Sequence, residues 1–165
     1  MSTCVLCGGK NFINVTIVSL EGPDGGPEFK VTCPASVCQT PECESQYYEN
    51  NILSHVAFAI TRMLLERPFL TGPQFDYCRR GLEMSWQELS RVTGDNPDDI
   101  RGLVGGTVGH VPAPWRAALK EIAVALAGCR SQPAELEIEP LDAVDSEEFD
   151  DWYLRDSDRV PSAGA

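Results

Sequence analysis

Five of the seven cysteines lie within the first 43 residues, at a spacing that is typical of a metal site. Cys4 and Cys7 are separated by two residues, and Cys33, Cys38 and Cys43 follow further along the chain. Two short cysteine clusters that a hairpin brings together offer four thiolates to one Zn²⁺. In so short a segment, the metal replaces a hydrophobic core that the residues are too few to build.

Four of these five cysteines are expected to be ligands, and the sequence does not decide which two form the second pair. Cys33 and Cys38 enclose four residues, as do Cys38 and Cys43. We expect Cys43 to be one ligand and either Cys38 or Cys33 to be the other. Four thiolates favour Zn²⁺, with iron in a rubredoxin-like site as the alternative. A closed thiolate site leaves no open coordination position, so the metal is expected to be structural.

The elements around these cysteines are predicted to be a hairpin followed by a helix. Residues 12–18 are rich in β-branched side chains, 21–27 form a turn cluster, and 29–32 read as a second strand. Apolar residues then recur at a spacing of three to four over 51–66, which predicts a connecting helix that ends before Pro68.

Residues 71–128 are predicted to form a series of short helices. Thr71-Gly-Pro opens the first, and Ser85-Trp-Gln-Glu88 is a capping box that opens the second. Asn96-Pro-Asp-Asp opens the third, with an N-cap, a proline and two acids in its first turn. A last helix follows Pro114. Cys78 and Cys129 are expected to be buried small hydrophobic residues.

Residues 131–165 are predicted to be an acidic, largely irregular tail. They hold 11 of the 25 acidic residues, which accounts for most of the net charge of −12. Phe149, Trp152 and Tyr153 interrupt the acidic run, and a segment of this kind can fold on a protein partner. These three aromatic residues are the candidate partner-binding residues.

Composition argues against several classes of function. A negative chain lacks the excess of Lys and Arg that a non-specific nucleic-acid binder needs. Neither a signal peptide nor a membrane span is predicted, and an odd number of cysteines fits a cytoplasmic metal site better than a disulfide framework. No nucleophile motif or phosphate loop is present, so we expect no enzymatic activity.

The order of these motifs resembles a known family. The helical block, with Ser85-Trp-Gln-Glu-Leu-Ser-Arg-Val-Thr-Gly94 in its second helix, resembles the Xre-type helix-turn-helix of Cro and the phage repressors. A zinc ribbon, a linker helix and this domain, over about residues 1–128, resemble the MqsA-type antitoxins.

That resemblance implies an α+β protein of several modules. These are a zinc ribbon at 1–50, a linker helix at 51–70, an all-α helix-turn-helix domain at 71–128 and the acidic tail at 129–165. It also implies a homodimer that binds operator DNA, with Ser85 and Gln87 on phosphates and with further contacts from Arg101 and from neighbours such as Thr107. A toxin or other protein would bind the ribbon or the tail.

The sequence departs from the family where DNA would be read. Asp98 and Asp99 stand at the start of the recognition helix, and Leu103-Val-Gly-Gly replaces the usual Trp-Glu-x-Gly. Arginines and a lysine elsewhere in the block could still form a basic face: Arg79, Arg80, Arg91, Arg101, Arg116 and Lys120. Two alternatives therefore stay open. One is an acidic, DNA-mimic-like adaptor or inhibitor whose helix-turn-helix has lost DNA binding, and the other is a metal-binding accessory subunit.

Overall fold

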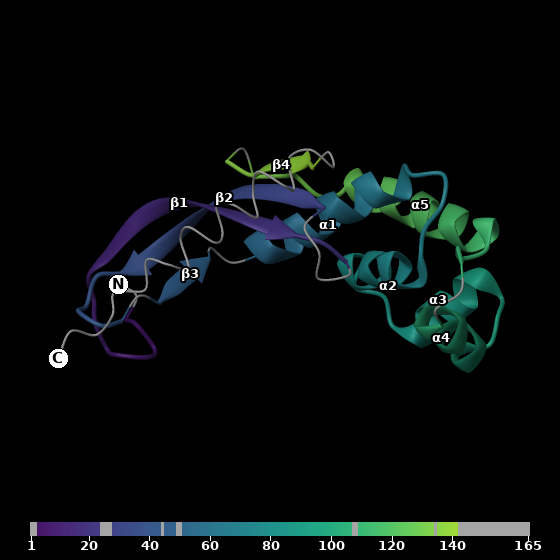
Figure 1. Cartoon of the computed structure of the whole chain (residues 1–165), viewed down its shortest axis with the longest axis horizontal. Coiled ribbons are helices and arrows are strands. Elements are labelled where there is room, and N and C mark those ends of the chain that lie inside the picture. Colours follow the sequence, from purple (N-terminus) through teal and green to yellow (C-terminus); the bar gives the residue numbers. More distant parts are fainter. Residues whose placement is uncertain are drawn as a thin grey trace.

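A small antiparallel sheet and five α-helices make up the described part of the chain, which confirms the α+β class. The computed structural model describes residues 3–23, 28–43, 45–48, 51–106, 109–133 and 135–141. Figure 1 shows an elongated molecule, with the sheet toward one end, helices α2, α3 and α4 toward the other, and helix α1 between them. The predicted partner residues Phe149, Trp152 and Tyr153, and the predicted DNA contact Thr107, lie outside the described residues.

The predicted hairpin is present and is longer than expected. Strand β1 (Phe12–Glu21) pairs antiparallel with β2 (Phe29–Cys38) over ten residues of continuous register. The other edge of β2 pairs with two short strands, β3 (Gln46–Tyr48) and β4 (Glu137–Pro140). Both short pairings are also antiparallel, and they occupy opposite ends of β2.

Strand β4 corrects the expectation of an irregular tail that starts at residue 129. Ile138 stands opposite Val31 of β2, and Leu136 just before β4 is buried in the core. Apolar side chains alternate with glutamates here, and alternation with a period of two suits a strand with one buried face. Residues 137–140 are therefore a strand and not part of an irregular tail.

One face of β2 joins the sheet to the helices. Phe29, Val31 and Cys33 alternate along the strand and are almost fully buried. They belong to the same hydrophobic core as Ile52 and Val56 of helix α1 (Ile52–Leu65). Hence the part of the hairpin near Phe29 is stabilised by hydrophobic packing. The part near Cys38 lacks the helices as packing partners and needs other interactions to hold it.

The helical block follows the predicted caps. Helices α2 (Gly72–Gly81), α3 (Trp86–Thr93), α4 (Pro97–Gly105) and α5 (Ala113–Ala127) begin where the sequence indicates. The Thr71 and Ser85 side chains both complete capping boxes, and Asn96 Oδ1 accepts from the amide of Asp98 at 2.9 Å. The core of the block is apolar and closed, and its fully buried members are Phe75, Cys78, Leu89, Ile100 and Leu119.

The turn between α3 and α4 is held in place by a side chain of α5. Trp115 of α5 donates its indole N–H to Asp95 Oδ2 at 2.7 Å, and its ring lies 5.7 Å from that of Phe75. Because Asp95 stands between the two helices, α5 holds the α3–turn–α4 unit against the core. A short turn therefore joins α3 and α4.

Of the two cysteines outside the first 43 residues, one is buried as predicted and the other is not. Cys78 in α2 is buried as expected, and burial raises the pKa of its thiol to about 12. Cys129 is exposed, which contradicts the expectation of burial, because it lies beyond the end of α5 rather than on its inner face. Among the described residues, no helix is long and apolar enough to cross a membrane.

A candidate tetrathiolate metal centre and the surface of the helix pair

Four cysteines converge at one end of the sheet. The sulfur atoms of Cys4, Cys7, Cys38 and Cys43 all lie within 4.8 Å of one another. Cys4 Sγ is 3.5 Å from Cys43 Sγ, and Cys7 Sγ is 3.7 Å from Cys38 Sγ. Zn–S bonds of about 2.3 Å in a tetrahedron place sulfur atoms roughly 3.8 Å apart. The four side chains therefore fit one Zn²⁺.

The first pair of sulfurs is held by a tight backbone loop. The amide of Gly8 donates to the carbonyl of Cys4 at 2.8 Å, and the amide of Cys4 donates to the carbonyl of Gly9 at 2.8 Å. Gly8 adopts φ +74°, which suits glycine. The Gly9 amide points back at the loop and donates to Cys7 Sγ at 3.4 Å. The sequence Cys-x-x-Cys-Gly-Gly thus forms a closed knuckle.

The second pair is held by a turn directly after β2. The Cys43 amide donates to the Thr40 carbonyl at 3.0 Å, with Pro41 and Glu42 at the two central positions. Glu42 has φ +67°, and proline followed by a residue of positive φ is the pattern of a type II turn. This turn brings Cys43 back beside Cys38, at the end of the strand.

Cys33 is not part of the cluster, which resolves the open choice at the second pair. It lies within β2, where it is 2% exposed and belongs to the hydrophobic core. Successive side chains of a strand point to opposite faces, so residues five positions apart cannot share a face. Burial, and the nearby charge of Glu21, raise the pKa of Cys33. It is a packing residue.

Every sulfur of the cluster has a hydrogen-bonding partner in addition to its neighbours. Tyr47 Oη lies 3.0 Å from Cys4 Sγ, Ser45 Oγ lies 3.1 Å from Cys43 Sγ, and Thr40 Oγ1 lies 3.3 Å from Cys38 Sγ. Sequence reasoning missed these three hydroxyls. Thr40 and Ser45 each follow a ligand by two residues, a local signal that could have found them, but only the pairing of β3 with β2 brings Tyr47 close.

The thiols of the cluster do not ionise alike in the absence of a cation. The hydrogen bond from Tyr47 lowers the pKa of Cys4 to about 5, and hydrogen bonding to Thr40 lowers that of Cys7. Ser45 favours the thiolate of Cys43, but Cys7, burial and Cys4 outweigh it and raise that pKa to about 11. A bound cation would favour the thiolate forms of Cys4, Cys7 and Cys43, because it compensates their mutual repulsion.

Gly9 provides a first test of this centre. A Cβ at this position would lie 2.0 Å from Thr40 Oγ1 and 3.2 Å from Cys7 Sγ. We expect Gly9→Ala to push these two groups apart and to weaken metal binding by about tenfold or more, as displaced outer-shell groups do. Competition for the metal with a coloured chelator measures this. Gly106→Ala is the control, since a Cβ there meets nothing closer than 3.4 Å.

The predicted DNA contacts that the structure describes lie together on the helix pair. Ser85 and Gln87 are exposed at the start of α3, and Arg101 is exposed on α4. Trp86 lies between Ser85 and Gln87 in α3, and the guanidinium of Arg101 is 5.5 Å from the centroid of the Trp86 ring. Ser85 is already engaged in its capping box, so its hydroxyl accepts from the Glu88 amide at 3.1 Å.

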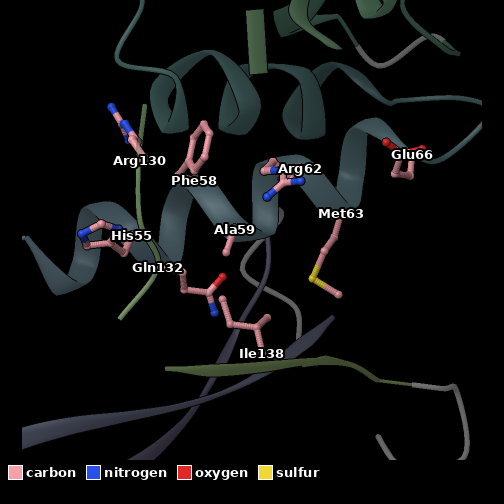
Figure 2. A pocket seen from close by; sticks show the side chains of 9 residues that line it. All are labelled: His55, Phe58, Ala59, Arg62, Met63, Glu66, Arg130, Gln132 and Ile138. Atoms are coloured by element: carbon pink, nitrogen blue, oxygen red, sulfur yellow. The ribbon is translucent and has the colours of Figure 1, made fainter. Parts of the chain in front are cut away.

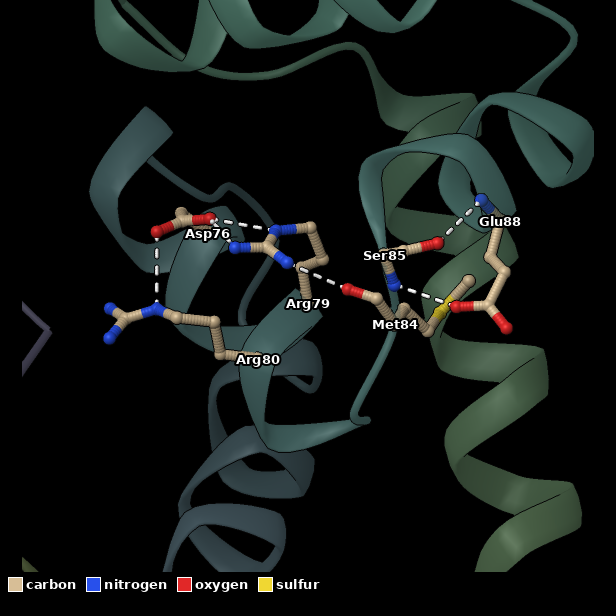
Figure 3. Close-up of polar contacts among 6 residues, drawn as sticks. All are labelled: Asp76, Arg79, Arg80, Met84, Ser85 and Glu88. Atoms are coloured by element: carbon tan, nitrogen blue, oxygen red, sulfur yellow. Dashed lines mark hydrogen bonds and ion pairs between the residues drawn. The ribbon is translucent and has the colours of Figure 1, made fainter.

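Half of the expected basic face is neutralised by ion pairs. Arg79 and Arg80 both pair with Asp76, at 2.8 and 3.1 Å, and Arg79 also donates to the Met84 carbonyl at 2.7 Å, as Figure 3 shows. Lys120 pairs with Glu66 at 2.9 Å. Within the described part of the helical block, this leaves three arginines without an ion-pair partner within 4.0 Å. Arg116 of α5 donates instead to the Leu65 carbonyl at 3.2 Å, so Arg91 of α3 and Arg101 of α4 are the exposed ones.

A cavity of about 300 Å³ lies between α1 and β4, and its lining mixes charged and apolar side chains. Figure 2 shows Arg62 and Arg130 above it and Ile138 below it. The guanidinium of Arg130 is already committed, since it stacks on Phe58 at 4.7 Å and pairs with Glu83 at 3.4 Å. The other lining residues are both polar and apolar, so the cavity is a partly open space left by imperfect packing between α1 and β4.

Comparison with protein-family models, with curated proteins and with solved structures finds no match to this chain. Its function is therefore inferred from its own residues.

Proposed function

We propose that Cys4, Cys7, Cys38 and Cys43 hold one structural Zn²⁺ and that the chain is a DNA-binding transcription regulator. One observation carries the second part. In the described helical block, the two exposed cations without an ion-pair partner, Arg91 and Arg101, both lie on the α3–α4 pair. A recognition helix and its neighbour need free cations to contact phosphates and base edges. Such regulators act as symmetric dimers, and we include a homodimer in the proposal.

A mobility-shift assay tests this function. The zinc-loaded protein is titrated against the DNA upstream of its own coding region at two salt concentrations. Specific binding that weakens steeply with salt is the expected result, because phosphate contacts release counterions. Absence of binding by the wild-type protein at both salt concentrations contradicts the proposal.

Arg101→Ala and Arg80→Ala form a matched pair for the same assay. We expect Arg101→Ala to weaken binding by about tenfold or more and to reduce the salt dependence. Arg80→Ala removes the same charge from α2, where it already pairs with Asp76, and should bind as the wild type does. Equal losses in both variants would indicate that net charge, and not the α4 surface, governs binding.

A second function is favoured by a different observation. Asp98 and Asp99 are exposed in the first turn of α4, which is the turn that would face DNA. These carboxylates stabilise the helix N-terminus but repel phosphates. An adaptor or inhibitor that binds a basic protein surface, for example a toxin, would use them instead. On that proposal the protein ignores DNA, and replacing Trp152 and Tyr153 with alanine abolishes capture of its partner.

A further inference from the structure

The hydroxyl of Tyr47 is placed to act on the metal centre through one sulfur. It accepts a hydrogen bond from the amide of Val5 at 3.1 Å and lies 3.0 Å from Cys4 Sγ. Because the Val5 amide already occupies the oxygen as acceptor, the phenolic proton is free to point at the sulfur. A metal-bound Cys4 is a thiolate that can only accept, so the direction of the bond is fixed as Tyr47 to Cys4.

The ring of Tyr47 is held as firmly as its hydroxyl. It stands in β3, where it pairs with Ser36 of β2, and Phe12 of β1 packs edge-on against it with ring centroids 5.4 Å apart and planes at 83°. Three strands therefore set the position of one hydroxyl. The neighbouring Tyr48 differs, since its hydroxyl lies 3.5 Å from Gln46 Oε1.

We propose that Tyr47 is a positioning residue for the metal, which slows metal release by donating a hydrogen bond to the Cys4 thiolate. This inference rests on the proposed Zn²⁺ site and deepens it. A hydrogen bond to an ionised acceptor is stronger than one between neutral groups, and it draws charge from the sulfur. It also ties the N-terminal knuckle, which carries the first two ligands, to the sheet that carries the other two.

Other hydrogen-bonding groups reach the remaining sulfurs, mostly from the same loop as the sulfur, although Thr40 of the second knuckle also bonds to Cys7. Gly9 serves Cys7 from within the first knuckle, and Thr40 and Ser45 serve Cys38 and Cys43 from within the second. Tyr47 differs from them because it stands in β3 and contacts the first knuckle at two points, the Cys4 sulfur and the Val5 amide. Its removal should therefore affect the metal more than its single hydrogen bond suggests.

The test compares Tyr47→Phe with Tyr48→Phe in the full-length, zinc-loaded protein. Both changes delete one hydroxyl and keep the ring, and the second serves as the control. We expect Tyr47→Phe to weaken zinc affinity by about 10- to 100-fold, the usual effect of an outer-shell partner, and to speed zinc transfer to a coloured chelator. Tyr48→Phe should match the wild type in both measurements.

Cobalt substitution supplies a readout that a merely structural role would not change. Loss of the hydrogen bond leaves more charge on the sulfur, so the sulfur-to-cobalt charge-transfer band of Tyr47→Phe should move to lower energy. An unmoved band together with equal zinc release from both variants would overturn this inference alone. A wild-type protein that takes up neither zinc nor cobalt would overturn the metal site as well.

Discussion

Replacing Cys38 with serine is expected to remove the bound metal, whereas replacing Cys33 with serine should leave the metal in place. Cys38 belongs to the four-sulfur cluster, and its sulfur is 3.7 Å from that of Cys7. A serine there leaves three thiolates, and a neutral hydroxyl is a poor ligand for Zn²⁺. Because the free energy of metal binding in a structural site is also folding free energy, this end of the sheet should lose its structure together with the metal.

The Cys33 variant reports on packing rather than on the metal. The side chain is 2% exposed among apolar neighbours, and a hydroxyl buried there without a partner costs about 1–3 kcal/mol of stability. Metal content by mass spectrometry and the cobalt spectrum of both variants measure the difference. Metal retained by the Cys38 variant and lost by the Cys33 variant would contradict the ligand set.

Metal removal should unfold only part of the first 50 residues. The end of the hairpin at Phe29 and Val31 packs into the core that α1 shares, while the opposite end closes around the cysteines. Hydrogen exchange after chelation should therefore rise in residues 4–9 and 38–48 and stay slow around Val31. A uniform rise across the whole hairpin would mean that the sheet has no stability apart from the metal.

The sequence predicted the helices well and the sheet incompletely, for physical reasons. Caps such as Thr71, Ser85 and Asn96 act within one turn, so the residues that start a helix are local in sequence. The position of Cys33 in the interior of a strand depends on residues far away in the sequence. Cys33-Pro34 looks like a loop, yet Pro34 pairs with Thr16 at a point of β2 that lies between the segments bound by β4 and β3, where a missing N–H is tolerated.

Alternation along β2 was the signal that could have decided between Cys33 and Cys38. Phe29, Val31, Cys33 and Ala35 are buried, and polar residues or proline stand between them. That pattern assigns Cys33 to the core face and ends the strand at Cys38. Strand β4 shows the same alternation, with Leu136 and Ile138 between glutamates, but its pattern is short, and its partner lies more than a hundred positions away.

Adding a methyl group to Gly72 is expected to destabilise the helical block, whereas the same change at Gly102 should stabilise it slightly. Gly72 begins α2, and a Cβ there would lie 2.1 Å from the carbonyl oxygen of Val104 in α4. The obstacle is backbone, so one helix must move. Overpacking of this kind costs about 1–3 kcal/mol, and more where nothing can relax.

Gly102 makes the comparison sharp because it lies on α4 itself. It is exposed, and a Cβ there meets nothing within 4 Å. Alanine is the better helix former, so Gly102→Ala should gain about 0.4–1 kcal/mol. Urea unfolding of both variants checks the signs. Under the proposed function, the displaced α4 of Gly72→Ala should also bind DNA less tightly than wild type at temperatures where the variant is still folded. Unchanged stability in Gly72→Ala would mean that α2 and α4 are not packed as closely as the Gly72–Val104 contact requires.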